Sequence, residues 1–142
     1  MKKNIRRAQI LCALSATPLD RLRLMKSLFL FWYRAGKPNS GPFEFKAYLY
    51  GPCSFDLYES LQEMEKEGLV VQPVDREKAP YYLTKAGVAA AFADKHLSSE
   101  EKQLLTNLAQ WSVHQSFSSL LSIVYKEAPE FASASIVRDR IL

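Results

Sequence analysis

Few residues of this sequence are of the types that carry catalysis or hold a metal. The chain has two cysteines, Cys12 and Cys53, and two histidines, His96 and His114. Cys53 precedes an expected helix start, where a thiolate is stabilised. The four positions lack the paired spacing of a zinc site, and the sequence contains no phosphate-binding glycine loop or nucleophile elbow. We therefore predict no catalytic residue, no metal and no cofactor, and we do not expect an enzyme.

Basic residues that would suit phosphate contacts gather in the first third of the chain. Residues 1–46 hold ten of the 19 lysines and arginines but only two acids, a formal charge of +8, and residues 47–142 carry −4. This asymmetry indicates an anionic partner, either nucleic acid or an acidic protein. Alternatively, the basic third docks onto the acidic remainder of the same fold. The predicted nucleic-acid contacts are Lys2, Lys3, Arg6, Arg7, Arg23, Lys26, Arg34, Arg76 and Lys78.

A stripe of carboxylates provides a second candidate surface. Its members are spaced i, i+3, i+7 and i+11, so they line the outside of one expected helix. They are Asp56, Glu59, Glu63 and Glu67. Like charges at this spacing cost a few tenths of a kcal/mol per pair, which a basic partner protein would recover. Pairing with lysines or arginines of the N-terminal helices, or simple solvation, would explain the stripe equally well.

Aromatic residues are dense just before and within that helix. Six lie within 16 residues: Phe43, Phe45, Tyr48, Tyr50, Phe55 and Tyr58. Alternation along a strand places Phe43 and Phe45 in the core. Tyr48 and Tyr50 then suit a protein interface, because tyrosine is enriched at such sites. A core completed by a C-terminal helix is the alternative for the tyrosines.

The elements that must position these residues are mainly helical. Hydrophobic periodicity and capping residues predict helices over 4–16, 18–35, 54–67, 85–94, 98–114 and 118–126. Thr17 is expected to cap the second helix with Asp20 at its N3 position, Thr84 the fourth, and Ser98 with Glu101 the fifth. A strand is expected over 43–50, broken by Gly51-Pro52, and two more over 69–74 and 81–83, joined by a charged turn.

This order predicts an α+β, mainly helical fold. Three helices followed by a short β-hairpin wing match a winged-helix-like core, with a C-terminal helical extension. We expect a single domain over 1–142, made of a core (1–95), the extension (96–131) and a tail (132–142) without a firm pattern. No stretch approaches a membrane span, and no convincing signal peptide precedes the first helix, so we expect a cytoplasmic protein. The helices after residue 98 would suit a homodimer contact.

Several segments resemble one family. They are 22–31 (LRLMKSLFLF), 43–52 (FEFKAYLYGP), 61–70 (LQEMEKEGLV), 82–87 (YLTKAG) and 123–130 (IVYKEAPE). Together they resemble the SocA-like antitoxin domain, also called Panacea, and the related YwgA-type proteins, over about residues 5–135. The resemblance implies a winged-helix-like fold without enzymatic activity, associated with toxin neutralisation, regulation or phage defence. It supplies no site residues.

The function that we predict is a non-catalytic regulatory module that binds a macromolecule. In most winged-helix proteins the third helix reads DNA, but here its outer face carries the acidic stripe, which phosphates repel. Nucleic acid would therefore bind the basic first third, with phosphate contacts added from Arg76 and Lys78 of the wing. The alternative is an antitoxin-like adaptor that neutralises or delivers a partner protein, such as a toxin or a defence component. Internal pairing of Arg23, Lys26 and Arg34 would weaken the nucleic-acid hypothesis.

Overall fold

The computed structural model describes residues 2–36, 41–76 and 78–138. Within these ranges helices dominate, and two short antiparallel strand pairs accompany them. The elements in chain order are α1 (Lys2–Ala16), α2 (Arg21–Arg34), β1 (Lys46–Tyr48), β2 (Gly51–Cys53), α3 (Phe55–Lys66), β3 (Val70–Val71), β4 (Tyr82–Leu83), α4 (Lys85–Ala93), α5 (Ser99–Ser112), α6 (Phe117–Glu127) and a 3₁₀ turn, η1 (Pro129–Ala132). The predicted α+β, mainly helical fold class is confirmed.

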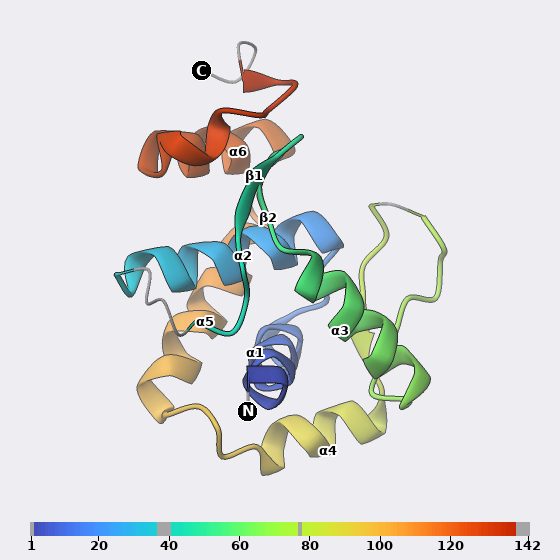
Figure 1. The fold of residues 1–142 in the computed structure, drawn as a ribbon. Helices are drawn as coiled ribbons and strands as arrows, with labels where there is room; N and C mark the ends of the chain where they lie inside the picture. Colours follow the sequence, from blue (N-terminus) through green and yellow to red (C-terminus); the bar gives the residue numbers. More distant parts are fainter. Residues whose placement is uncertain (1, 37–40, 77, 139–142) are drawn as a thin grey trace.

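Helix α1 occupies the centre of the molecule, with α2, α3, α4 and α5 arranged around it (Figure 1). Its segment 8–14 is buried on every side. Ile10 and Ala13 have no exposed surface, and Leu14 is almost as deeply buried. A helix that is buried all round needs apolar residues all round, and the sequence AQILCAL supplies them with a single polar member, Gln9.

The first three helices and the β3–β4 hairpin form the winged-helix-like core. Val70 pairs with Leu83 and Val71 with Tyr82, and a bridge between Leu19 and Tyr81 ties the α1–α2 connection to the hairpin. Both strands are shorter than the predicted 69–74 and 81–83. Pro73 follows β3 closely and has no backbone N–H to continue the ladder, so the chain leaves the sheet there.

A second hairpin, which the sequence reading missed, lies between α2 and α3. Gly51-Pro52 does not break a strand but begins β2, which pairs with β1 in the register Tyr48↔Gly51, Ala47↔Pro52 and Lys46↔Cys53. Gly51 adopts φ +86°, a left-handed conformation that glycine reaches without steric cost. The expected strand over 43–50 is accordingly reduced to three residues, Lys46–Tyr48. The hairpin rises beside α6 (Figure 1).

The C-terminal helices pack against the winged-helix-like core and contribute buried residues to it. Leu105 and Ala109 of α5 belong to the same buried cluster as Ile10 of α1. Tyr125 of α6 is fully buried in a second cluster around Phe29 of α2. Among the described residues, no helix is long and apolar enough to cross a lipid bilayer. Residues 139–142 of the predicted tail lie outside the described ranges.

Two of the three predicted caps are confirmed. The Thr84 hydroxyl accepts a hydrogen bond from Gly87 N at 3.0 Å, and Ser98 forms a reciprocal capping box with Glu101. The predicted Thr17 cap is wrong. Helix α2 begins three residues later, with Asp20 at the N-cap, and the Thr17 hydroxyl donates to Pro18 O instead.

Candidate binding groove

The basic residues of α1 lie against the acidic stripe of α3. Three ion pairs join the two helices: Lys3 Nζ to Glu63 Oε2 at 3.0 Å, Arg6 to Asp56 at 3.7 Å, and Arg7 to Glu67. Of the four stripe residues, Glu59 alone has no ion-pair partner among the described residues. This is the arrangement in which the basic third docks onto acidic residues of the same fold, so most of the stripe does not face a partner as free charge.

The basic residues of α2 are committed elsewhere in the chain. Arg23 pairs with Asp20 at 3.1 Å. It also donates to the backbone carbonyl of Ser112, the last residue of α5, and to that of Gln115, just after the helix. Arg34 makes a two-pronged pair with Glu127 at 2.8 and 2.9 Å. Arg23, Lys26 and Arg34 do not contact Glu59, Glu63 or Glu67, but each has a partner inside the fold.

Lys26 requires a correction of its predicted role. Its side chain is buried, with 2% of the residue exposed, and Nζ donates to Pro52 O at 2.9 Å. A phosphate cannot reach an ammonium group enclosed between α2 and the β1–β2 hairpin, so the prediction that Lys26 contacts nucleic acid is wrong. The predicted cations that lie exposed without an ion pair among the described residues are Lys2, Arg76 and Lys78.

The ion pairs between α1 and α3 should contribute measurably to the free energy of unfolding. Reversing one charge, as in Arg7→Glu or Glu67→Arg, is expected to destabilise the fold, and the double reversal is expected to restore it. Because both side chains are partly exposed, the coupling free energy should be about 0.5–1 kcal/mol and should shrink in about 1 M NaCl. Urea unfolding of the four proteins measures it. A coupling of zero at low salt would contradict the intrachain pair.

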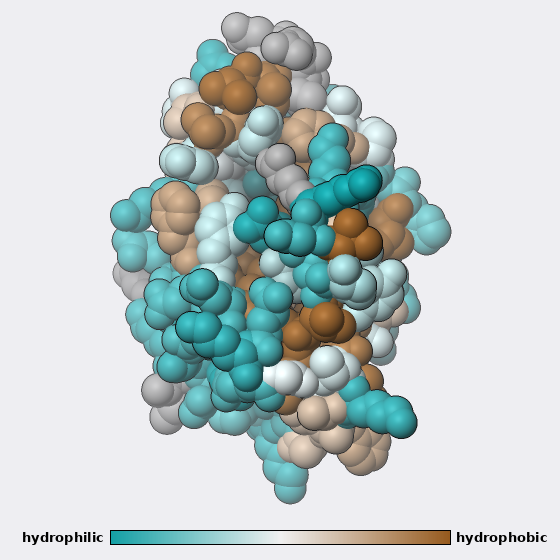
Figure 2. Space-filling model, turned by 90° about the vertical axis from the view of Figure 1, so that its right-hand side faces the viewer, coloured by the Kyte–Doolittle hydropathy of each residue, from teal (hydrophilic) through white to brown (hydrophobic). Residues whose placement is uncertain are grey.

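A groove of about 870 Å³ opens where four elements meet the start of α2. The β1–β2 hairpin contributes Tyr48 and Tyr50, and α3 contributes Phe55 and Tyr58. Lys78 enters from the loop between β3 and β4, Phe117 from the start of α6, and Val137 from the segment after η1. The volume lies in the range of ligand-binding clefts. Viewed toward α3 and this loop, the surface is mostly hydrophilic, and hydrophobic residues appear as separate patches (Figure 2).

The rings in the groove support one another while remaining accessible. Phe55 packs edge-on against Tyr48, with ring centroids 5.3 Å apart, and against Tyr58 at 5.9 Å. Tyr50 meets Phe117 in the same way at 5.7 Å. Phe55 is 55% exposed and Tyr48 44% exposed. Edge-to-face pairs hold the rings in place, so a partner would meet a preformed aromatic surface at a small cost in side-chain entropy.

Two cations lie over these rings. The Arg21 guanidinium is 5.3 Å from the centroid of Tyr58, and Lys78 Nζ is 5.5 Å from that of Phe117. Neither makes an ion pair with a described carboxylate. The acid lining the groove, Asp20, is buried and bonded to Arg23. The groove is therefore aromatic and positively charged, which suits a partner segment that combines an acid with an apolar group.

The groove phenol with the largest pKa change is Tyr58. Burial, a hydrogen bond from the Cys53 thiol at 3.7 Å and the charges of Cys53 and Tyr48 raise its pKa to about 12, and the Arg21 charge acts in the opposite direction. The phenol therefore stays neutral and retains its hydrogen-bonding role through the ordinary pH range. The Cys53 thiol is engaged in this hydrogen bond to Tyr58. In the described part of the chain, no group of three or more histidine, cysteine or acidic residues is placed to hold a metal.

The groove brings together residues that the sequence reading assigned to different partners. Tyr48 and Tyr50 were predicted for a protein, and Arg23 and Lys78 for nucleic acid; all four line this groove. Phe55 and Tyr58 belong to the aromatic run of the sequence but were predicted no role, and Arg21 and Phe117 were not predicted as site residues. Comparisons of the chain with protein-family models, curated proteins and solved structures found no match.

Proposed function

We propose that the protein is a non-catalytic adaptor that binds a partner protein in the aromatic groove. The observation that carries this proposal is the exposed ring set of Tyr48, Phe55 and Tyr58 beneath Arg21, which has no ion-pair partner among the described residues. Aromatic residues and arginine dominate binding free energy at protein interfaces. The segment bound there would carry an acid for Arg21 or Lys78 and an apolar side chain for the rings.

The pairing of charges inside the fold favours a protein over nucleic acid. A nucleic-acid interface depends on lysines and arginines that neutralise phosphates. Of the nine cations predicted for that role, Lys26 is buried, and the others on α1 and α2, apart from Lys2, are bonded within the chain. A toxin or a defence component is the class of partner that the SocA-like resemblance suggests, and we place the interaction in the cytoplasm.

Selection of displayed peptides on the immobilised protein tests the proposal. Binding sequences are expected to share an acidic residue next to an aromatic or large aliphatic one. Phe55→Ala should weaken the selected peptide about 30-fold, because truncating a central interface ring costs about 2 kcal/mol or more. Calorimetric titration measures the change. Phe92→Ala is the matched control, since Phe92 is an aromatic residue 93% exposed on α4, outside the groove.

Selected peptides that lack a common acidic–apolar pattern, or that bind Phe55→Ala as tightly as the unchanged protein, would contradict the proposal. Nucleic acid is the second candidate, since Lys2, Arg76 and Lys78 are exposed and unpaired among the described residues. Titration of labelled duplex and single-stranded DNA across a salt series tests it. Tight binding that weakens steeply with salt and is lost on replacing Lys2, Arg76 and Lys78 would favour nucleic acid over the adaptor.

A further inference from the structure

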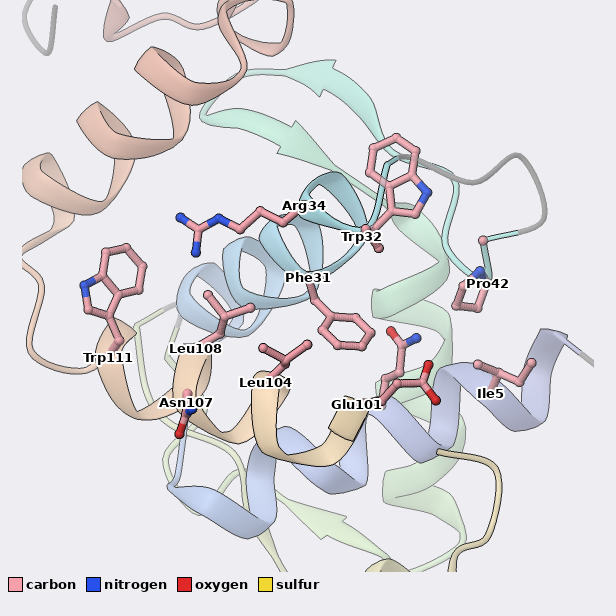
Figure 3. A pocket seen from close by; sticks show the side chains of 13 residues that line it. Ile5, Phe31, Trp32, Arg34, Pro42, Glu101, Leu104, Asn107, Leu108 and Trp111 are labelled. Atoms are coloured by element: carbon pink, nitrogen blue, oxygen red, sulfur yellow. The ribbon is translucent and has the colours of Figure 1, made fainter. Parts of the chain in front are cut away.

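Another hollow, of about 770 Å³, lies between α1, α2 and α5, away from the aromatic groove. Its apolar walls come from Ile5 of α1, Phe31 of α2, and Leu104, Leu108 and Trp111 of α5. Figure 3 shows Phe31 and Leu104 facing into the space, with Trp111 at one end and Ile5 at the other. Volume and lining are those of a small-molecule pocket, and a single side chain of a partner would fill only part of it.

The charged and polar groups at the rim are already engaged. Arg34 is held by both carboxylate oxygens of Glu127. Glu101 accepts from Ser98 N at 2.9 Å in the capping box of α5. Asn107 accepts from Gln103 at 3.0 Å. Because these groups are committed within the fold, the described part of the lining offers no free charge to an ion, which favours a neutral occupant.

Gln9 differs from the other polar residues that line this pocket. It is 94% removed from solvent in the centre of α1, and its carboxamide has no hydrogen-bond partner among the described residues. Its nitrogen and oxygen are not sealed off, since Ser27 Oγ is the one side-chain nitrogen or oxygen of the described residues that is both wholly buried and unbonded. The carboxamide therefore meets water in the pocket, and a ligand there would take over that hydrogen bond.

We propose that this pocket binds a neutral, largely aromatic small molecule carrying one hydrogen-bonding group that pairs with the Gln9 carboxamide. Phe31 and Trp111 supply ring surfaces, and the leucines of α5 supply aliphatic contact. The inference is independent of the proposed adaptor function, because the two hollows share no lining residue. A small molecule bound here would lie outside the aromatic groove and would leave that groove open to a partner protein.

Titration with N-phenyl-1-naphthylamine, a neutral fluorescent probe with one N–H, tests the inference. We expect saturable binding of one molecule per chain. Excitation of tryptophan should sensitise the probe, since both tryptophans of the chain, Trp32 and Trp111, line the pocket. Leu104→Arg places a charge in the pocket and should weaken binding at least tenfold. Leu104 is 54% exposed, so the fold should tolerate the change, and Val88→Arg, on α4 at 57% exposure, is the matched control.

Gln9→Leu provides the second variant and tests the hydrogen bond. It retains the apolar walls, so probe binding should persist but weaken by about fivefold, the equivalent of one neutral hydrogen bond. The inference is overturned by non-saturable binding, or by equal affinity of Leu104→Arg and Val88→Arg. It is also overturned if Phe55→Ala, which alters only the aromatic groove, removes probe binding. Circular dichroism confirms that each variant is folded.

Discussion

Alanine in place of Gly51 is expected to lower the free energy of unfolding by about 4 kcal/mol, combining a left-handed backbone penalty with overpacking. Gly51 has φ +86°, and a Cβ built there would lie 2.5 Å from Cε1 of Tyr125. The ring has little freedom to move, because Tyr125 is fully buried and its hydroxyl is 2.7 Å from the Ser135 hydroxyl. A loss of this size is a large share of the stability of a small domain.

Gly68→Ala separates the two contributions. Gly68 also has a positive φ, of +76°, but a Cβ built there meets nothing within 4 Å. Gly68→Ala should therefore lower the free energy of unfolding only by the penalty for a left-handed backbone, about 1–2 kcal/mol. Urea unfolding followed by circular dichroism gives both values on one scale. If Gly51→Ala costs no more than Gly68→Ala, the close approach of Tyr125 to the hairpin is not present in solution.

The position of Gly51 connects this stability test to the candidate groove. The residue closes the tight turn between β1 and β2, and the same hairpin carries Tyr48 and Tyr50 into the groove. Tyr125 of α6 packs against the hairpin at Gly51. The aromatic groove therefore depends on a glycine that is not among the residues lining it.

Local chemistry explains which elements were predictable. The caps at Thr84 and Ser98 involve hydrogen bonds within three residues, so sequence spacing reveals them. The β1–β2 hairpin escaped prediction because Gly-Pro usually ends a strand. A glycine with positive φ can equally begin the return strand of a tight turn. Proline is tolerated beside it where its missing N–H points away from the neighbouring strand.

The site was less predictable because its residues are far apart in sequence. The charge asymmetry was visible, but its pairing depended on how α1 crosses α3, which places Arg7 beside Glu67 sixty residues away. Tyr50 meets Phe117, and Arg21 meets Tyr58, only after α2, α3 and α6 have packed. Helical periodicity identifies the exposed face of one helix, but it does not identify the helix that will cover that face.

Methionine in place of Lys26 is expected to stabilise the protein at about pH 7 by about 1–2 kcal/mol, because a buried ammonium is costly to desolvate. Burial is the main cause that lowers the pKa of Lys26 from 10.5 to about 8, while nearby Cys53 acts in the opposite direction. The substitution also leaves Pro52 O without the Lys26 donor, which offsets part of the gain.

The pH dependence gives the sharper test. Between pH 8 and 10.5 the unfolded chain holds the Lys26 proton and the folded chain has released it, so stability rises with pH across this window. The full rise from this group is about 3 kcal/mol. In the Lys26→Met variant this contribution should be absent. Lys46→Met, which removes a well-exposed lysine from β1, should keep it.

Other groups titrate in the same window with the opposite sign, so the difference between variants is the quantity to measure. Burial raises the pKa of the Cys12 thiol, and the pKa of Tyr58 lies at about 12, so both groups favour the folded state less as pH rises above their ordinary values. Both remain in Lys26→Met and cancel in the comparison. Parallel pH profiles for Lys26→Met and the unchanged protein would mean that the ammonium is solvated in solution. Lys26 would then again be available to an anionic partner, and nucleic acid would gain a phosphate contact on α2.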